Sequence, residues 1–332
     1  MTCWNAVPGA LALVVVAAGI AGGQEAPPLS DSPRQSLDDA WWTGPMLAPS
    51  ASTLPRGHFL VEPYVFDVIR YGRYDSDGHR QSASRSHSFG SLAYVLYGLV
   101  DKFTVGLLPS VGYNTMTGGP SSSGAGFGDL TLNAQYRLTL FHEGDWIPTT
   151  SIVVEETFPT GNYNRLARAN NAFGSGAYTT TLSLYSQMYF WLPNGRILRT
   201  RLDVSGGFSS SVNIADASAY GTAAGFRGHA QPGNFFFVDA SWEYSITRSW
   251  VLALDVTYRH DASTNVTGHN VQDPASPAIA FDTGSSEALG IAPAIEYSWK
   301  SSLGVLLGVR IIPAGRNTSA TITPAVAINI VY

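Results

Sequence analysis

The 332-residue chain has few charged side chains, which make up 13% of it, and a single cysteine, Cys3. Soluble domains usually carry about 25% charged residues, so the composition is unusual for one. Beyond the first 23 residues, no apolar run reaches the roughly 20 residues that a membrane-spanning helix needs. The formal net charge of −5 argues against nucleic acid as a partner. These shortages disfavour both a helical membrane protein and an ordinary soluble one.

Residues 1–23 have the features of a secretory signal peptide. The apolar stretch ALALVVVAAGIA is short, and the small residues Ala21 and Gly23 suit cleavage before Gln24. The segment contains no Lys or Arg, which departs from the usual pattern, and a retained membrane anchor is the alternative. Because Cys3 lies in the part to be removed, without a lipobox around it, we expect a mature chain that lacks disulfides, thiol catalysis and cysteine-bound metal.

Alternation of apolar and polar residues, typical of strands with two different environments, recurs along the chain. In FGDLTLNAQYRL, Leu130, Leu132 and Leu138 share one face, and Asp129 and Arg137 share the other. The stretches RTRLDVSGGF, FFFVDASWEYSI and SWVLALDVTYRH repeat this pattern. Such apolar faces are too many and too aromatic for one interior, so we expect them to face lipid on the outside of a barrel.

About twelve such segments occur, and their connections alternate in length. The segments begin near residues 58, 86, 103, 127, 148, 178, 197, 235, 249, 285, 302 and 319. Tight turns such as VDKF, LPNG, TRS and KSS alternate with long polar loops, with TLFHEGDWIP and PAGRN as exceptions. Short periplasmic turns and long external loops are typical of outer-membrane barrels. The sequence therefore predicts an all-β fold, a transmembrane antiparallel β-barrel of about 12 strands in an up-and-down meander over residues 57–332, in the bacterial outer membrane.

The last strand, SATITPAVAINIVY, should close against the first, near HFLVEPYVFDVI, because lipid cannot satisfy an unpaired strand edge. Its apolar face ends on the aromatic C-terminal residue and consists of Val326, Ile328, Ile330 and Tyr332. This pattern resembles the C-terminal signal by which the outer-membrane assembly machinery recognises barrels. We interpret these four residues as an assembly signal.

Residues 24–56 are rich in Pro and Ser and contain the segment DDAWWTGPM. They form either a disordered periplasmic leader or a short element in the mouth of the barrel. Trp41 and Trp42 are unusual in a pure linker, which favours partial docking.

The stretches YGLVDKFTVGLLP, GAGFGDLTLNAQYRL and ETFPTG, with the segment AWWTGPMLAPSASTLPRGHFLVEPY, resemble a family of bacterial outer-membrane barrels. The family is named after the meta-pathway of phenol degradation and is classed with transporters. The resemblance covers most of residues 41–332. It implies the barrel fold, the outer-membrane location and uptake of aromatic or other hydrophobic compounds.

The polar faces of the strands carry charges of both signs that we expect to line the lumen. These residues are Asp129, Arg137, Glu155, Arg199, Arg201, Asp203, Asp239, Glu243, Asp255, Arg259, Glu296 and Arg310. Arg199 and Arg201 could hold an anionic solute, but we favour their pairing with Asp203 and Asp239. A barrel of about twelve strands lies between one that side chains fill and one with an open channel. A salt-bridged, plugged interior and a narrow selective pore therefore remain equal alternatives.

Some charged residues are not placed inside the lumen by this pattern. The first two strands do not define a phase, so Glu62, Asp67 and Arg70 stay unassigned. Glu156 and Glu287 fall on the lipid phase near long loops, where the cost of exposing a charge to lipid is small.

An outer-membrane lipid enzyme would need a nucleophile and a base on one strand face, two residues apart. Ser86 and Ser88 are each adjacent to His87 and point the other way, while His260 and Ser263 lie at a loop edge. The seven histidines show no metal-ligand spacing. We therefore predict no catalytic residues, no cofactor and no metal.

These features predict a monomeric outer-membrane channel or transporter for small hydrophobic or aromatic solutes. Its expected partners are outer-membrane lipid, the assembly machinery and a small-molecule solute. One alternative is a plugged structural or binding barrel that displays surface loops. The least favoured alternative is an outer-membrane lipid-modifying enzyme.

Overall fold

A computed structural model describes residues 34–272 and 277–332 of the chain. Its two helical elements, η1 (Leu37–Asp39) and η2 (Ala169–Asn171), are single 3-10 turns, and the other regular elements are strands. None of the helices in these two ranges is long and apolar enough to cross a membrane. The predicted signal peptide lies outside the described residues.

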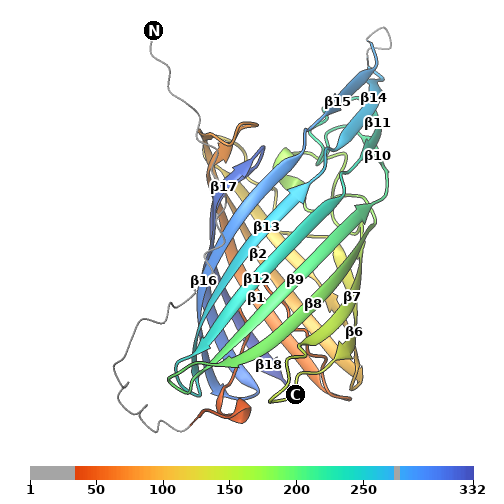
Figure 1. Cartoon of the computed structure of the whole chain (residues 1–332). Helices are drawn as coiled ribbons and strands as arrows, with labels where there is room; N and C mark the ends of the chain where they lie inside the picture. Colours follow the sequence, from red (N-terminus) through yellow and green to blue (C-terminus); the bar gives the residue numbers. More distant parts are fainter. Residues whose placement is uncertain (1–33, 273–276) are drawn as a thin grey trace, which may run out of the picture. The chain divides into compact units, whose positions relative to one another are not determined.

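Fourteen strands form one antiparallel sheet that closes on itself (Figure 1). They are β1 (Phe59–Tyr74), β2 (Arg80–Val100), β3 (Phe103–Leu108), β4 (Ser110–Met116), β5 (Gly126–Phe127), β6 (Leu130–Thr139), β7 (Thr149–Phe158), β8 (Thr179–Trp191), β9 (Ile197–Ser209), β12 (Phe235–Ser245), β13 (Trp250–Asp261), β16 (Ser286–Lys300), β17 (Leu303–Arg316) and β18 (Ser319–Val331). Each strand pairs with the neighbouring strands of the wall, and β1 pairs with both β2 and β18. β3 and β4 are two parts of one interrupted wall strand, and so are β5 and β6. The described residues therefore form a barrel of twelve wall strands. The predicted fold is confirmed.

The first and last strands close the barrel, as the sequence predicts. Along the seam Leu60 lies opposite Val331, and Ile69 lies opposite Ile322. The backbone N–H of Phe59 donates to the carbonyl of Tyr332 at 3.0 Å, and the N–H of Tyr332 donates to the carbonyl of Phe59 at 2.9 Å. The hydrogen bonds of the sheet thus continue to the last residue of the chain.

The wall is apolar outside and polar inside. Leu184, Leu202 and Leu307 are about half exposed on the outer face, while Gln187 and Thr257 are buried on the inner face. Successive side chains of a strand point to opposite faces, so the alternation in the sequence becomes a lipid-facing surface and a polar interior.

Four further strands form a separate small sheet within the long loops. They are β10 (Val212–Ala215), β11 (Phe226–Gln231), β14 (Asn265–Asn270) and β15 (Ile279–Asp282), paired in that order. Val212, Ile214, Phe226, Ala230 and Val266 form its hydrophobic core. This sheet continues from the end of the barrel that bears the long loops (Figure 1). We did not predict it from the sequence.

Candidate functional site

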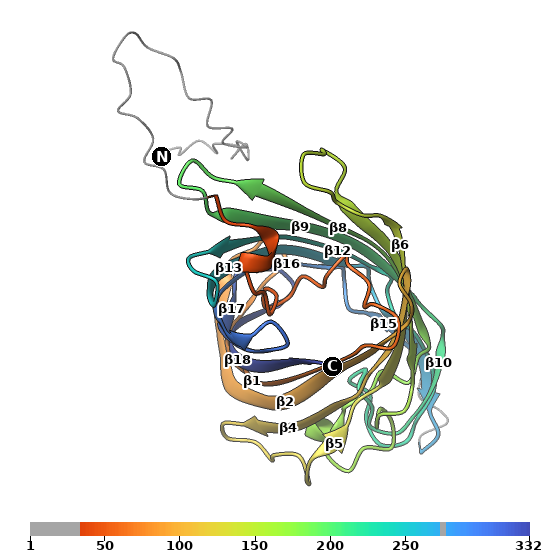
Figure 2. The same cartoon turned by 90° about the horizontal axis from the view of Figure 1, so that it is seen from below.

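Residues 34–56, here called the strap, cross the barrel lumen before β1 begins. Seen from below, the strap runs through the ring of strands (Figure 2). Near one end, the backbone N–H of Gln35 donates to the carbonyl of Gly195 at 3.0 Å, in the turn between β8 and β9. Near the other end, the N–H of Arg56 donates to Oδ1 of Asp101 at 3.0 Å, in the turn between β2 and β3. The strap therefore enters and leaves the lumen at the end of the barrel that bears the tight turns.

Two buried carboxylates of the wall hold the middle of the strap. Glu296 Oε2 accepts hydrogen bonds from the backbone N–H of Thr43 at 2.7 Å, from its hydroxyl at 2.9 Å and from the N–H of Gly44 at 3.1 Å. Asp255 accepts from the N–H of Met46 at 3.0 Å. Among the described residues the strap pairs with no strand, and leaving these donors unpaired inside the barrel would cost about 1–3 kcal/mol each. The carboxylates therefore satisfy the strap backbone.

Carbonyl groups of the strap receive hydrogen bonds from side chains on β6, β7 and β9. Gln135 Nε2 donates to the carbonyl of Ser50 at 2.9 Å, and Ser151 Oγ donates to that of Ala51 at 2.5 Å. Arg201 Nη1 donates to the carbonyl of Ala48 at 2.7 Å. The strap is thus hydrogen-bonded on both sides of the lumen.

The two tryptophans of the strap stack with arginines of the barrel. The guanidinium carbon of Arg248 lies 4.5 Å from the ring centre of Trp41, and that of Arg199 lies 4.4 Å from Trp42. The Trp42 ring also meets Tyr189 edge-on, with 6.4 Å between ring centres. Cation–π contacts of this kind are worth about 0.5–2 kcal/mol each. They account for aromatic residues in a segment that otherwise reads as a linker.

At two positions of the wall, a glycine provides the space that the strap occupies. A Cβ atom on Gly98 would collide with the carbonyl of Pro55, and one on Gly304 would collide with the Thr43 side chain. Any larger residue at either position would push the strap away from the wall.

Arg199 and Arg201 share one carboxylate, that of Glu243. Arg199 forms a bidentate ion pair with Glu243, in which Nε lies 2.6 Å from Oε2. Nε of Arg201 lies 3.2 Å from the same oxygen. The pairing with Asp203 and Asp239 that we favoured from the sequence is therefore wrong. The reason is strand register, because Glu243 lies directly opposite Arg199 across β9 and β12.

The same register places Asp203 directly opposite Asp239, so two carboxylates face each other. Both residues are almost completely buried, at 1% and 0% exposure. None of their four carboxylate oxygens has a hydrogen-bond partner among the described residues.

The other predicted lumen residues take different positions. Asp129 accepts hydrogen bonds from the backbone N–H groups of Gly161, at 2.9 Å, and Ser175, at 2.7 Å, and so anchors the long loop between β7 and β8. Arg137 is half-buried close to the turn end of β6. Neither Asp129 nor Arg137 lines the cavity beside the strap.

Glu155, Arg259 and Arg310 line the cavity beside the strap. Glu155 accepts a hydrogen bond from Asn133 at 3.0 Å, and Arg259 binds Asp261 on its own strand. Nε of Arg310 has no hydrogen-bond partner in the part of the chain that the structure describes.

Of the residues that the sequence left unassigned, Glu62 also lines this cavity. No local pattern identifies its face, because apolar residues lie on both faces of β1. The side chain of Asp67 lies on the opposite face of β1, and its Oδ2 atom is 2.8 Å from Nδ1 of His87. Because Ser86 and Ser88 precede and follow His87 on the strand, they lie on the other face of the wall. This arrangement does not bring a serine to the Asp67–His87 pair.

The cavity between the strap and the wall has a volume of about 550 Å³. Its aromatic lining consists of Trp42, Tyr64, Tyr94, Tyr185, Phe235 and Phe237. A smaller cavity of about 260 Å³ adjoins the strap at Met46 and Leu47, and Phe66 and Leu92 are among its largely apolar lining residues. The larger cavity falls within the size range of sites that bind small organic molecules, and the smaller one lies just below it.

One group of described side chains could share a metal ion, and it lies outside the barrel. Asp75, Asp77 and His79 lie in the hairpin turn between β1 and β2, with their ligand atoms within 4.8 Å of one another. Hydrogen bonds to Asp75, above all the one from Gln81, lower the pKa of this carboxyl below its usual value. The same bonds hold the turn, so the group has a structural explanation.

Residues 71–323 match the sequence profile of the family described as "Putative MetA-pathway of phenol degradation". The chain belongs to this family. No curated protein sequence matches it.

Among solved structures, the COG4313 outer membrane channel from Pseudomonas putida F1 has a TM-score of 0.65 and 17% identity, over 86% of this chain and 100% of that chain. The Pseudomonas putida toluene transporter TodX matches with a TM-score of 0.39 and 12% identity, over 88% and 95% of the two chains. The first likeness supports the fold of this family member, and the second is too distant to support an argument. The closed barrel and the family place the chain in the bacterial outer membrane.

Proposed function

We propose that the chain is a monomeric outer-membrane channel for small hydrophobic or aromatic solutes, closed at rest by the strap. The observation that carries this proposal is the cavity of about 550 Å³ inside a sealed barrel wall, lined by aromatic side chains and by the strap itself. A cavity inside the wall is useful to a solute in transit only if the strap can move. The name of the family and the channel function stated for the COG4313 structure support the same proposal.

The strap contacts explain how such a channel could be closed without being sealed permanently. Glu296 and Asp255 hold it through hydrogen bonds to its backbone, and water could replace these bonds one by one. The strap side of the larger cavity is formed by residues 42–50 and 52–54, among which Trp42, Met46 and Leu47 have large side chains. In this proposal, displacement of residues 43–50 from the wall widens the cavity into a path for the solute.

Uptake of toluene by intact cells tests the proposal. We expect cells that make the full-length protein to accumulate labelled toluene faster than cells that make a mutant which fails to assemble, because the lipopolysaccharide leaflet slows entry of hydrophobic solutes. Filling the cavity by Ser205→Trp should remove most of the gain, while Ser123→Trp, in an external loop, should leave it intact. Equal uptake in all four strains would contradict the channel proposal.

A second candidate function is a permanently plugged barrel that displays its loops. The number of hydrogen bonds between the strap and the wall favours it, and so does the small external sheet with its own core. Under this alternative the strap would stay docked under all conditions, and toluene uptake would not depend on the protein.

A further inference from the structure

The arginines that line the larger cavity are mostly occupied. Arg199 and Arg201 bind Glu243, and Arg259 binds Asp261 through its Nε and Nη2 atoms. Paired guanidinium groups have little free capacity for an anionic solute, because their charge and their donors are already used. These three arginines therefore attract an anionic solute less strongly than three unpaired guanidinium groups would.

The fourth arginine, Arg310, is not a free anion site either. The charged groups facing it are Asp239 and Asp255, with Arg259 as a like charge. An anion bound at Arg310 would have to approach these two carboxylates, and like charges in a partly dry site repel strongly.

Three carboxylates on the cavity wall, those of Glu62, Glu155 and Asp203, form no ion pair among the described residues, and Arg201, the cation nearest to Glu62 and Asp203, is already bound to Glu243. Glu155 has an amide partner, Asn133, and Glu62 interacts with the amide of Asn329 and lies 3.5 Å from the hydroxyl of Tyr64. Both oxygens of Asp203 are buried without any hydrogen-bond partner in the described part of the chain. Asp203 has the carboxylate of Asp239 behind it, which adds negative potential.

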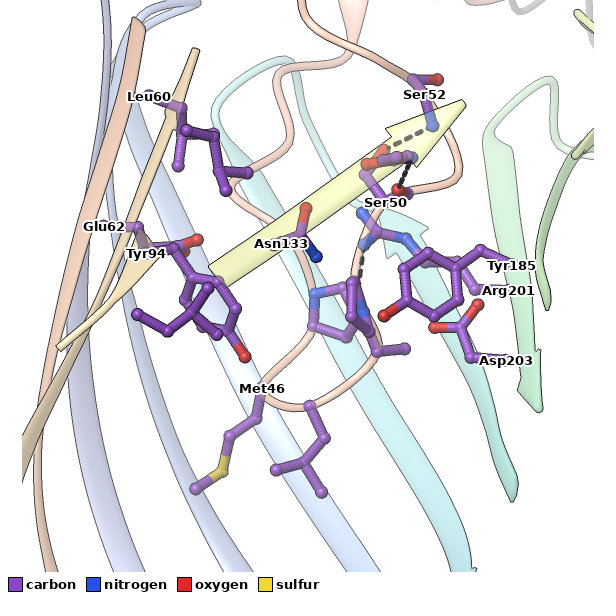
Figure 3. Close-up of a pocket in the computed structure, with 18 of the residues that line it drawn as sticks. Met46, Ser50, Ser52, Leu60, Glu62, Tyr94, Asn133, Tyr185, Arg201 and Asp203 are labelled. Carbon is purple, nitrogen blue, oxygen red and sulfur yellow. Dashed lines mark hydrogen bonds between the residues drawn. The ribbon is translucent and has the colours of Figure 1, made fainter. Parts of the chain in front are cut away.

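Tyrosines separate these carboxylates around the wall. Tyr94 on β2 lies within electrostatic reach of Glu62 and Glu155, and Tyr185 on β8 lies within reach of Glu155 and Asp203. Figure 3 shows Glu62, Tyr94, Tyr185 and Asp203 around one space, next to the strap. We call Glu62, Tyr94, Glu155, Tyr185 and Asp203 the acidic–aromatic arc.

We propose that the acidic–aromatic arc is a binding site for small organic cations, which have an apolar body and a protonated amine. Carboxylates attract the ammonium group, and the faces of aromatic rings bind cations through their quadrupole. The apolar body would lie against the aromatic and aliphatic side chains of the cavity. This proposal rests on the proposed channel function and names the solute class within it.

A chelated metal ion fits the arc less well. The three carboxylates come from β1, β7 and β9, and in the described residues they do not bring three ligand atoms within 4.8 Å of one another. Divalent ions need several oxygens at about 2–2.6 Å. An organic cation several ångströms long can contact separated carboxylates through one ammonium and its apolar body.

The test measures binding of three probes of matched shape to the full-length protein in detergent by calorimetric titration. The probes are phenethylammonium, neutral 2-phenylethanol and anionic phenylacetate. We expect phenethylammonium to bind about tenfold more tightly than 2-phenylethanol, as expected for one charge-assisted contact, and phenylacetate to bind most weakly. Equal affinity for the three probes, or tightest binding of phenylacetate, would overturn the proposal.

Variants assign the preference to the arc. The double variant Glu155→Gln with Asp203→Asn keeps the shapes of both side chains and should lose the tenfold preference, while Asp77→Asn in the external hairpin should keep it. Tyr185→Leu should weaken phenethylammonium binding about fivefold through loss of the ring face, and Tyr185→Phe should not. If the double variant does not assemble, Glu155→Gln alone and the comparison of Tyr185→Leu with Tyr185→Phe show whether the arc causes the preference for phenethylammonium. An unchanged preference in folded arc variants would overturn the assignment.

Failure of this proposal and failure of the channel proposal are distinguishable. Toluene uptake without a preference for phenethylammonium would overturn the cation site and leave the channel intact. Preferential phenethylammonium binding without toluene uptake would support the site in a barrel that does not conduct hydrophobic solutes.

Discussion

At the scale of single residues, the buried charges of the wall differ in how well they are matched. Glu243 and Asp239 lie on the same strand, β12, and both have 0% exposure. Glu243 receives two arginines, whereas Asp239 faces another carboxylate, Asp203. Their substitution should therefore have very different effects on stability.

Glu243→Gln should destabilise the barrel by about 3–5 kcal/mol, because it leaves two buried guanidinium groups without a counter-charge. Asp239→Asn should change stability by less than about 1 kcal/mol, because it removes the repulsion from Asp203 together with the attraction to Arg310 and keeps the side-chain shape. The measurement is the urea concentration at which half of the protein in detergent loses its folded electrophoretic mobility. Equal destabilisation by the two substitutions would contradict the charge assignment.

Tyr332 joins the seam and ends the proposed assembly signal. Its backbone bonds to Phe59, and its side chain is 78% exposed on the outer face. Tyr332→Ser keeps the backbone bonds, so any loss must come from the side chain. We expect a several-fold lower amount of protein in the outer membrane, measured by fractionation and immunoblotting, with Ser319→Ala at the other end of β18 as the control. Normal levels would show that the aromatic end is incidental.

At the scale of elements, the strap is held mainly through its backbone, and Glu296 is its best-connected anchor. The predicted mature chain contains no cysteine, so a single cysteine can report on docking. Ala48 is suitable because it is small and only 3% exposed.

In an Ala48→Cys background, Glu296→Gln should speed maleimide labelling about tenfold, because it weakens the charge-assisted bonds to the strap by about 1.5 kcal/mol. Glu287→Gln on the same strand is the matched control, since it lies in the outward phase near the external loops. If labelling is fast in the parent and unchanged by Glu296→Gln, the strap is not docked in the way the structure describes.

The sequence was informative where structure depends on local alternation. The strands β6, β9, β12 and β13 could be located and their faces assigned, because a lipid-facing strand must alternate. It was not informative on the partner of Arg199. A long loop connects β9 to β12, and the register between them depends on pairing along the whole strands, so Glu243 could not be distinguished from Asp239 as the partner.

Two further features could not be derived from local patterns. The strap is held by backbone groups of Thr43, Gly44 and Met46, which any residue type could supply, so only its tryptophans gave a signal. The small external sheet pairs β11 with β14, where Phe226 lies opposite Asn270, and such distant pairs of short strands carry no periodic signal.

At the scale of the whole molecule, closure of the sheet determines the solution behaviour. Every wall strand of the barrel pairs with a strand on both sides, so the described sheet has no free edge at the seam between β1 and β18. Opening such a barrel requires many backbone hydrogen bonds to break together.

Unboiled protein in detergent should therefore run at a different apparent mass from boiled protein, and its circular dichroism spectrum should be dominated by strands. Gly304→Leu, whose added side chain would collide mainly with Thr43 of the strap, should keep this behaviour. A helical spectrum, or equal mobility before and after boiling, would contradict a closed barrel.

The central claim is that the strap closes a lumen that is otherwise open, and conductance in planar lipid bilayers tests it most directly. The comparison is between the full-length protein and a variant that lacks residues 34–52 but keeps the turn-end anchors at Thr53 and Arg56. We predict little current through the full-length protein, interrupted by brief openings, and a steady current of larger amplitude through the variant. Steady currents of equal size in both, or no current in a correctly folded variant, would contradict this account.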